Sequence, residues 1–188
     1  MVETSDEWIR ERTGIGERHV SVGETVVTLA SEAARKALEQ AGKRAEEIDL
    51  ILVATCSPEQ YLPCCACQVQ ADIGAVNALA FDVNAACSGF LFALNTADAY
   101  LRMGLAENAL IIGSEVLSKL VDWTDRSSCI LFGDGAGAVV VEQCGTESRA
   151  VEYSNALPVV EEKRIPAAGI LGRSLHSDGT GGGVLQCG

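Results

Sequence analysis

Hydrophobic and polar residues follow two alternating patterns along the first two thirds of the chain. Residues 25–41 place apolar side chains at helical spacing, and Gly42 suits the end of that helix. Residues 49–56 then form a continuous apolar run of strand length, which is typical of a strand covered on both faces. The pattern therefore predicts a helix followed by a buried strand.

Both patterns return twice before the rhythm changes. They predict helices over 64–74 and 87–103 and buried strands over 79–84 and 108–116. Each of the two helices ends at or beside a glycine, which suits a helix C-terminus. Because strands that are separated by helices pair in parallel through right-handed crossovers, we expect a largely parallel sheet with helices on both faces.

Short turns replace the helices in the rest of the chain. Strands are predicted over 129–132 and 135–143, with a further strand over 148–153. Closely connected strands pair in antiparallel fashion, so we expect them to extend the end of the parallel sheet. The predicted fold class is α/β, with residues 1–188 as a single unit.

Composition and charge exclude several functions. The chain has 188 residues, 48% of them hydrophobic, and a net charge of −12. An acidic chain of this kind is unsuited to nucleic acid, because phosphate binding needs a basic face. No apolar run is long enough to cross a bilayer, and the start "MVETSDEW" lacks the features of a secretory signal. We therefore expect a cytoplasmic protein that is not embedded in a membrane.

The cysteines do not form a recognisable metal site. There are eight of them, at positions 56, 64, 65, 67, 87, 129, 144 and 187. Cys64 and Cys67 form a C-x-x-C motif, but no second pair exists, and the two histidines, His19 and His176, are isolated. A redox pair would follow a strand, whereas "SPEQYLP" precedes this motif. We interpret most of the cysteines as small packed side chains.

The segment "FDVNAACSGFLFAL" places Cys87 where a predicted strand gives way to a predicted helix. A thiol in the first turn of a helix lies among unpaired N–H groups at the positive end of the helix dipole, which favours the thiolate. The same N–H groups can stabilise the oxyanion that forms when the thiolate attacks a carbonyl. The pattern suits acyl transfer through a thioester, although a buried cysteine at a crowded junction would look the same.

Three glycines in "FGDGAGA", at 133, 135 and 137, invite comparison with a phosphate-binding loop. Such a loop lies between a strand and the N-terminus of a helix. The run "AVVV" follows here, which predicts a strand. We therefore assign the glycines to a tight turn and close backbone approach, and reject nucleotide binding by this loop.

Four segments together resemble one enzyme family. The segments "TSDEWIRERTGIGERHV", "FDVNAACSGF", "DWTDRSS" and "LFGDGAGAVVVE", in this order, are similar to the N-terminal half of the beta-ketoacyl-acyl carrier protein synthase III family. The resemblance implies the thiolase fold, which has two pseudo-symmetric halves, each a five-stranded mixed sheet between helices. Residues 1–188 would supply most of the first half, without its first strand and without the C-terminal half.

The resemblance also implies roles for single residues. Cys87 matches the nucleophile that accepts the acyl group. Trp8 and Arg12 match a pair that sandwiches the adenine of coenzyme A, Arg126 matches another coenzyme A contact, and Thr4 matches a hydroxyl near the adenine. Indole and guanidinium groups are suited to stacking on a base. Without the resemblance, an aromatic side chain at the edge of the core and solvated charges would explain the same residues.

Leu62, in "EQYLPCC", marks a departure from the family, which often has phenylalanine there. The family implies that this loop reaches across a homodimer and closes the partner's acyl pocket. Leucine at this position would then change the depth of the pocket and the preferred starter.

The resemblance implies an acyltransferase that needs no cofactor. A short acyl-CoA would acylate the cysteine, and malonyl-acyl carrier protein would then undergo a decarboxylating condensation that initiates fatty-acid biosynthesis. The family's catalytic histidine and asparagine lie in the second half, so this chain alone is expected to reach at most the acylation step. The alternatives are a polyketide or 3-hydroxy-3-methylglutaryl-CoA type synthase, or a non-catalytic half-domain that pairs with a separate C-terminal chain.

Overall fold

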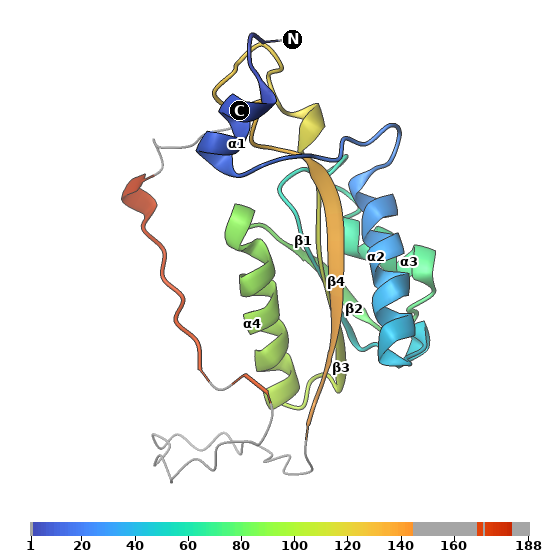
Figure 1. Cartoon of the computed structure of the whole chain (residues 1–188). Coiled ribbons are helices and arrows are strands. Elements are labelled where there is room, and N and C mark those ends of the chain that lie inside the picture. Colours follow the sequence, from blue (N-terminus) through green and yellow to red (C-terminus); the bar gives the residue numbers. More distant parts are fainter. Residues whose placement is uncertain (1, 145–168, 171, 182–188) are drawn as a thin grey trace.

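The computed structural model describes residues 2–144, 169–170 and 172–181 (Figure 1). Its helices and strands are α1 Asp6–Thr13, α2 Val26–Ala41, β1 Leu50–Ala54, α3 Cys65–Ile73, β2 Leu79–Val83, α4 Gly89–Arg102, β3 Asn108–Val116 and β4 Asp134–Glu142. Short 3-10 turns lie at Ala45–Glu47, Ala86–Ser88, Leu117–Lys119 and Gly179–Gly181. The strand expected over 148–153 lies outside the described residues.

The described strands form one sheet in the order β2-β1-β3-β4. β1 pairs in parallel with both β2 and β3, so that Leu50 lies opposite Leu79 on one side and Ala109 on the other. β4 joins the outer side of β3 in antiparallel fashion. This arrangement confirms the predicted α/β class and its largely parallel sheet with an antiparallel strand at one end.

Helices cover both faces of the sheet, as the pattern predicted (Figure 1). Alternate residues of β1 and β3 point to opposite sides. Ile51 and Ile112 pack with α2 and α3 on one face, whereas Leu52 and Ile111 pack with α4 on the other. These central strands are buried on both sides, and each large aliphatic side chain removed from water stabilises the fold by about 1.5–3 kcal/mol.

α2 begins and ends where its flanking residues require. Thr25 and Thr28 form a capping box at the N-terminus, and the carboxylate of Glu59 accepts a further hydrogen bond from the N–H of Val26. Gly42 closes the helix with φ of 63°, a left-handed conformation that glycine adopts without strain. The face towards the sheet carries small buried side chains, which let the helix approach closely: Ala30, Ala34 and Ala37.

α1 is a helix that the hydrophobic pattern did not predict. Its eight residues contain no buried side chain, so no apolar stripe marks it in the sequence. Capping residues fix the two ends of α1 instead. The hydroxyl of Ser5 accepts a hydrogen bond from the N–H of Trp8 at 3.2 Å, and Gly14 follows with φ of 71°.

The strand predicted over 129–132 is wrong, because this segment forms turns. Its backbone carbonyls are bound by a side chain from far away in the sequence. The guanidinium of Arg18 donates to the carbonyls of Cys129 at 3.0 Å and Phe132 at 3.2 Å, and also to that of Ile130. In a strand these carbonyls would accept hydrogen bonds from a neighbouring strand, whereas here they accept them from Arg18.

β2 is also less buried than predicted. It lies at the edge of the described sheet with one neighbouring strand, and Leu79 is 53% exposed. Apolar composition marked the strand correctly but could not show how many neighbours cover it. None of the helices in the described part of the chain has the length and apolar content that crossing a membrane requires.

Candidate active site at the carboxyl ends of the parallel strands

Three of the predicted site residues lie on the connections that leave the parallel strands. Leu62 is on the connection after β1, Cys87 follows β2, and Arg126 is on the loop after β3. Because the carboxyl ends of parallel strands meet at one edge of a sheet, all three connections start from the same edge. Open α/β sheets bind their ligands at this edge.

Cys87 lies in the 3-10 turn Ala86–Ser88, directly before α4. The expectation that the helix itself begins at Cys87 is therefore wrong by two residues. Ala86 has φ of 43°, the single non-glycine residue with positive φ in the described chain, and this conformation interrupts a regular helix. The side chain of Cys87 is exposed, so the alternative of a buried packing thiol does not fit.

The turn that holds Cys87 is fixed by close packing behind it. Gly89 is buried at the first position of α4, where an added Cβ would lie 3.2 Å from the Cβ of Ala54 at the end of β1. Ser88, the N-cap, makes no side-chain capping hydrogen bond, so its hydroxyl does not cover the first-turn N–H groups of α4. The arrangement presents a thiol beside the positive end of a helix.

Trp8, Arg12 and Arg126 form one cluster. The guanidinium carbon of Arg12 lies 4.3 Å from the centroid of a Trp8 ring, and that of Arg126 lies 4.4 Å away. Arg126 also donates from Nη1 to the carbonyl of Glu3 at 3.1 Å, which joins its loop to the segment before α1. The structure therefore brings together the three residues that the resemblance assigned to coenzyme A.

The cluster does not hold an open slot for adenine between Trp8 and Arg12. A ring inserted between the indole and the guanidinium needs about 3.5–4 Å on each side, whereas the two groups themselves are 4.3 Å apart. Arg12 is exposed and tied only by a 3.4 Å hydrogen bond to the carbonyl of Trp8 and a 3.8 Å ion pair with Glu11. Adenine binding would thus require this guanidinium to swing outwards.

Thr4 follows Glu3, the residue whose carbonyl binds Arg126, and lies in the wall of a hollow of about 170 Å³. Val2, Ile9, Arg18, Trp123, Cys129 and Ile130 line the rest of the hollow. Thr4 is exposed at the surface, on the segment directly before α1. The adenine contact predicted for Thr4 stays a prediction.

Leu62 and Tyr61 form an exposed apolar tip on the connection between β1 and α3. Their exposed fractions are 84% and 92%, and the Leu62–Pro63 peptide bond is cis. Neither side chain packs in the described core. The role of Leu62 in a partner's acyl pocket stays a prediction.

Glu115 ties the connection after β1 to β3, a role that no sequence pattern indicated. Its carboxylate accepts hydrogen bonds from the Thr55 hydroxyl at 3.2 Å, the N–H of Cys56 at 2.8 Å and the Ser57 hydroxyl. Ser57 in turn accepts from the N–H of Val116 at 3.0 Å. The network fixes the start of the loop that carries Leu62.

Asp134 plays a similar part at the start of β4. It accepts hydrogen bonds from the N–H of Ser21 at 2.7 Å and from the N–H and hydroxyl of Ser118 at 2.8 and 2.6 Å. Burial alone would raise the pKa of Asp134, but these hydrogen bonds outweigh it and hold the pKa below its ordinary value. The charged carboxylate thereby anchors the loop that carries Arg126.

The glycine-rich segment behaves partly as predicted. A Cβ at Gly133 would lie 3.1 Å from the carbonyl of His19 and 3.3 Å from the Cβ of Arg18, so the two backbones approach closely there. No such contact exists at Gly135 or Gly137. Gly135 and Gly137 lie inside β4 (Asp134–Glu142), so the tight turn expected at these two glycines is wrong. The segment continues as a strand rather than into a helix, so the geometry of a phosphate loop is not present.

The cysteines are less buried than expected. Of the seven that the structure describes, Cys65 and Cys129 are buried, whereas Cys87 and Cys144 are exposed and three lie in between. The interpretation as packed side chains fits Cys65 and Cys129, and Cys64 also packs against the core, but it does not fit the exposed Cys87 and Cys144. Cys187 lies outside the described residues. Within the described residues, no group of three or more His, Cys, Asp or Glu side chains could hold a metal ion.

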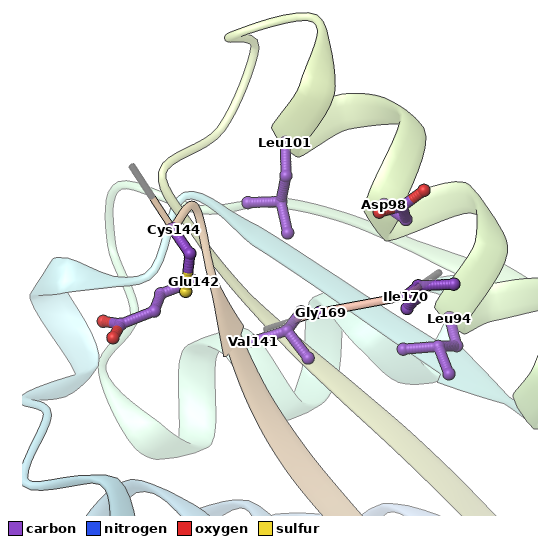
Figure 2. A pocket seen from close by; sticks show the side chains of 8 residues that line it. All are labelled: Leu94, Asp98, Leu101, Val141, Glu142, Cys144, Gly169 and Ile170. Atoms are coloured by element: carbon purple, nitrogen blue, oxygen red, sulfur yellow. The ribbon is translucent and has the colours of Figure 1, made fainter. Parts of the chain in front are cut away.

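A second hollow, of about 200 Å³, lies at the far end of α4 (Figure 2). Figure 2 shows its lining: Leu94, Asp98, Leu101, Val141, Glu142, Cys144, Gly169 and Ile170. Roughly 20 Å of helix separate Leu101 from the turn at Cys87. This hollow is therefore not part of the candidate active site.

Comparisons with known proteins identify the family that this chain resembles in sequence and in fold. The family model described as 3-Oxoacyl-[acyl-carrier-protein (ACP)] synthase III matches residues 81–157, which include Cys87 and β4. A curated beta-ketoacyl-[acyl-carrier-protein] synthase III from Anaplasma marginale is 50% identical over 186 residues, covering 98% of this chain and 53% of that relative.

Solved structures share the fold. The crystal structure of 3-oxoacyl-[acyl-carrier-protein] synthase III from Aquifex aeolicus has a TM-score of 0.73 and 54% identity, over 74% of this chain and 46% of that one. The priming beta-ketosynthase of a polyketide biosynthetic pathway has a TM-score of 0.73 and 39% identity, over 75% and 42%. The chain spans about half the length of the relatives it matches. By sequence and by fold, it belongs to the 3-oxoacyl-[acyl-carrier-protein] synthase III family.

Proposed function

We propose that this chain carries the acyl-accepting site of a beta-ketoacyl-acyl carrier protein synthase III, with Cys87 as the nucleophile. The observation that supports it most is the exposed thiol in the turn that leads into α4, at the carboxyl end of β2. The thiolate attacks the carbonyl carbon of an acyl-CoA, and the tetrahedral intermediate expels the thiolate of coenzyme A, which takes up a proton. An acyl-cysteine thioester remains.

The nucleotide end of coenzyme A would bind at the cluster of Trp8, Arg12 and Arg126. The indole offers a flat face for adenine, and the guanidinium groups offer cationic partners for phosphate or for the base. Movement of Arg12 away from Trp8 opens one side of the ring. Arg126, held by Glu3, keeps the loop after β3 in place while this happens.

The complete reaction of the family requires more than this site. In the proposed second step, malonyl-acyl carrier protein loses carbon dioxide, and its carbanion attacks the acyl-cysteine to give a 3-oxoacyl product that starts fatty-acid biosynthesis. The histidine and asparagine for this step are expected outside the present chain, as are most contacts with the acyl carrier protein. We propose no resident cofactor, and a homodimer as the assembly in which Leu62 lines the partner's acyl pocket.

Mass spectrometry of the intact chain after incubation with acetyl-CoA tests the first step. We expect one acetyl group per chain, located at Cys87 and removed by hydroxylamine. The variant C87S is expected to lose the label, whereas C144S, which removes another exposed thiol, keeps it. Equal labelling of C87S and the parent chain would overturn the proposal.

The same experiment separates the alternatives. A non-catalytic half-domain would take no label, and gel filtration with and without a separate C-terminal half would show whether the two chains pair. The similarity to a priming ketosynthase of a polyketide pathway supports a sister activity with another starter. A panel of acetyl-, longer and branched acyl-CoAs, compared between the parent chain and L62F, measures starter preference. Indifference to L62F would remove Leu62 from the proposed acyl pocket.

A further inference from the structure

Cys64 and Cys67 lie on the same turn at the start of α3. Cys64 is the N-cap, with an extended backbone (φ −65°, ψ 158°), and Cys67 is the third residue of the helix. Both side chains are partly exposed. The thiol of Cys67 donates to the carbonyl of Ala80 on β2 at 3.6 Å, and the nearby thiol of Cys64 raises the pKa of Cys67.

This spacing is close to what a disulfide requires. Residues three apart on a helix have Cβ atoms about 5–6 Å apart, and a disulfide needs about 3.5–4.5 Å. The extended backbone of an N-cap directs its side chain back over the first turn, towards the third helical residue. A rotation of the Cys64 side chain would close the remaining gap, while the carbonyl of Cys64 keeps the first helical hydrogen bond from the N–H of Gln68 at 3.2 Å.

The side chain of Cys64 does not have the usual role of an N-cap side chain, which is to accept a hydrogen bond from a first-turn N–H group. It makes no capping hydrogen bond. Asp82 of β2 caps the helix in its place, because its carboxylate accepts from the N–H of Cys65 at 2.8 Å and of Ala66 at 2.7 Å. Joining Cys64 to Cys67 would leave these capping bonds intact.

Cys65, between the two, is set apart from them. It is 1% exposed and packs in the core between α2, α3 and the sheet. Burial, together with the negative charge of Asp82, raises the pKa of Cys65 to about 12. This thiol is inaccessible, which leaves the partly exposed Cys64 and Cys67 as the pair that a small disulfide can reach.

We propose that Cys64 and Cys67 form a reversible intramolecular disulfide by exchange with a low-molecular-weight disulfide. One thiol loses its proton and attacks a sulfur of the small disulfide, which releases one small thiolate and leaves a mixed disulfide. The second cysteine, deprotonated in turn, attacks the protein sulfur of that mixed disulfide and releases the other small thiolate. Two protein thiols are oxidised, one small disulfide is reduced to two thiols, and the two protons go to the released thiolates.

The disulfide involves neither Cys87 nor the Trp8 cluster, so its formation can be measured separately from acyl transfer. It lies directly after the exposed tip of Tyr61 and Leu62, and the amide of Gln68 already donates to the carbonyl of Pro63 at 3.0 Å. Oxidation would add a covalent tie between this connection and α3. The first turn of α3, which follows the tip of Tyr61 and Leu62, would then be closed by a disulfide bond.

The test uses the 188-residue chain and oxidised glutathione as the probe. After incubation, the chain is denatured, all free thiols are blocked with one alkylating reagent, the protein is reduced, and the released thiols are labelled with a second reagent. Fragment-ion mass spectrometry then assigns each label to its cysteine. We expect the second label on Cys64 and Cys67 together and full reversal by dithiothreitol. The variant C87S/C144S, which lacks the two exposed thiols that glutathione would also modify, should lose two hydrogens per intact chain.

Variants locate the bond. C64S and C67S should each lose the closed disulfide and retain glutathione on the remaining cysteine, whereas C144S should still form it. If one of these variants unfolds, the assignment of the second label in the parent chain still tests the proposal. The proposal is overturned if Cys64 and Cys67 both accept the first label after oxidation, if glutathione stays on the wild-type pair, or if either cysteine is linked to Cys56 or Cys65 instead.

Discussion

The Cα of Gly89 faces the side chain of Ala54 so closely that an added Cβ would come within 3.2 Å of the alanine Cβ. One residue begins α4 and the other ends β1. Cys87 lies two residues before this contact, so the contact sets how far the nucleophile turn stands from the sheet. Small side chains at both positions are therefore a condition for the geometry of the candidate active site.

Replacing Gly89 by alanine should force α4 away from β1. Alanine favours a helix by about 1 kcal/mol over glycine, but overpacking costs about 1–3 kcal/mol, so we expect a small net loss of unfolding free energy and a slower acylation of Cys87. The double variant G89A/A54G should recover the acylation rate, because the second change removes the opposing Cβ. Urea denaturation and the rate of acetyl labelling measure the two effects. Equal rates in G89A and the parent would contradict this reading.

Removal of the Trp8 ring should weaken coenzyme A binding. Stacking of a base on an aromatic ring contributes about 1–3 kcal/mol, so we expect W8A to raise the dissociation constant by about tenfold or more. Y61A is the control, because Tyr61 is an aromatic side chain with an exposed fraction of 92% on a different connection, the one after β1. Titration calorimetry with coenzyme A gives both constants. If the two variants weaken binding alike, adenine does not stack on Trp8.

Arg18 should matter more for stability than other arginines at the surface. Its guanidinium serves three carbonyls of the 129–132 turn, and a lysine cannot reproduce this planar set of donors. We expect R18K to lower the free energy of unfolding by about 1–3 kcal/mol and to speed amide exchange in the turn. R10K, which changes an exposed pair with Asp6, should shift it by less than about 0.5 kcal/mol. Similar losses in both variants would argue against the role of Arg18.

Asp134 should make stability depend on acid pH. Its pKa is lower in the folded chain than the ordinary value of 3.8, so the unfolded chain binds the proton more readily. The stabilisation is complete above that value and disappears as the pH falls through the lowered folded pKa. D134N should cost about 1–3 kcal/mol near neutral pH, and its difference from the parent should shrink below about pH 4. A difference that stays constant down to pH 2 would contradict this assignment.

Much of the framework could be predicted from the sequence, because the signals are local. Continuous apolar runs marked β1 and β3, and Gly42 and Gly74 ended α2 and α3 where the structure ends them. The position of Cys87 between β2 and α4 was also visible. Each of these features depends on residues that are near one another in the chain.

The misplaced features depend on distant contacts. The segment 129–132 has an apolar composition typical of a strand, yet Arg18 holds its carbonyls from the other end of the chain. The pattern also could not reveal that Arg12 packs against Trp8 and closes the adenine slot. Glu115 and Asp134 escaped notice because a single acidic residue beside a strand carries no periodic signal, and only the fold brings serines to them.

Every residue assigned to substrate lies on α1, on the segment before it, or on a connection that leaves a strand at its carboxyl end. The turn between α4 and β3, at Gly104 and Leu105, belongs to the other end of the sheet and is exposed. An affinity tag or a reporter domain inserted there would sit away from the incoming thioester. The turn at Gly104 and Leu105 is therefore a suitable insertion site when acylation of Cys87 is to be measured in the engineered chain.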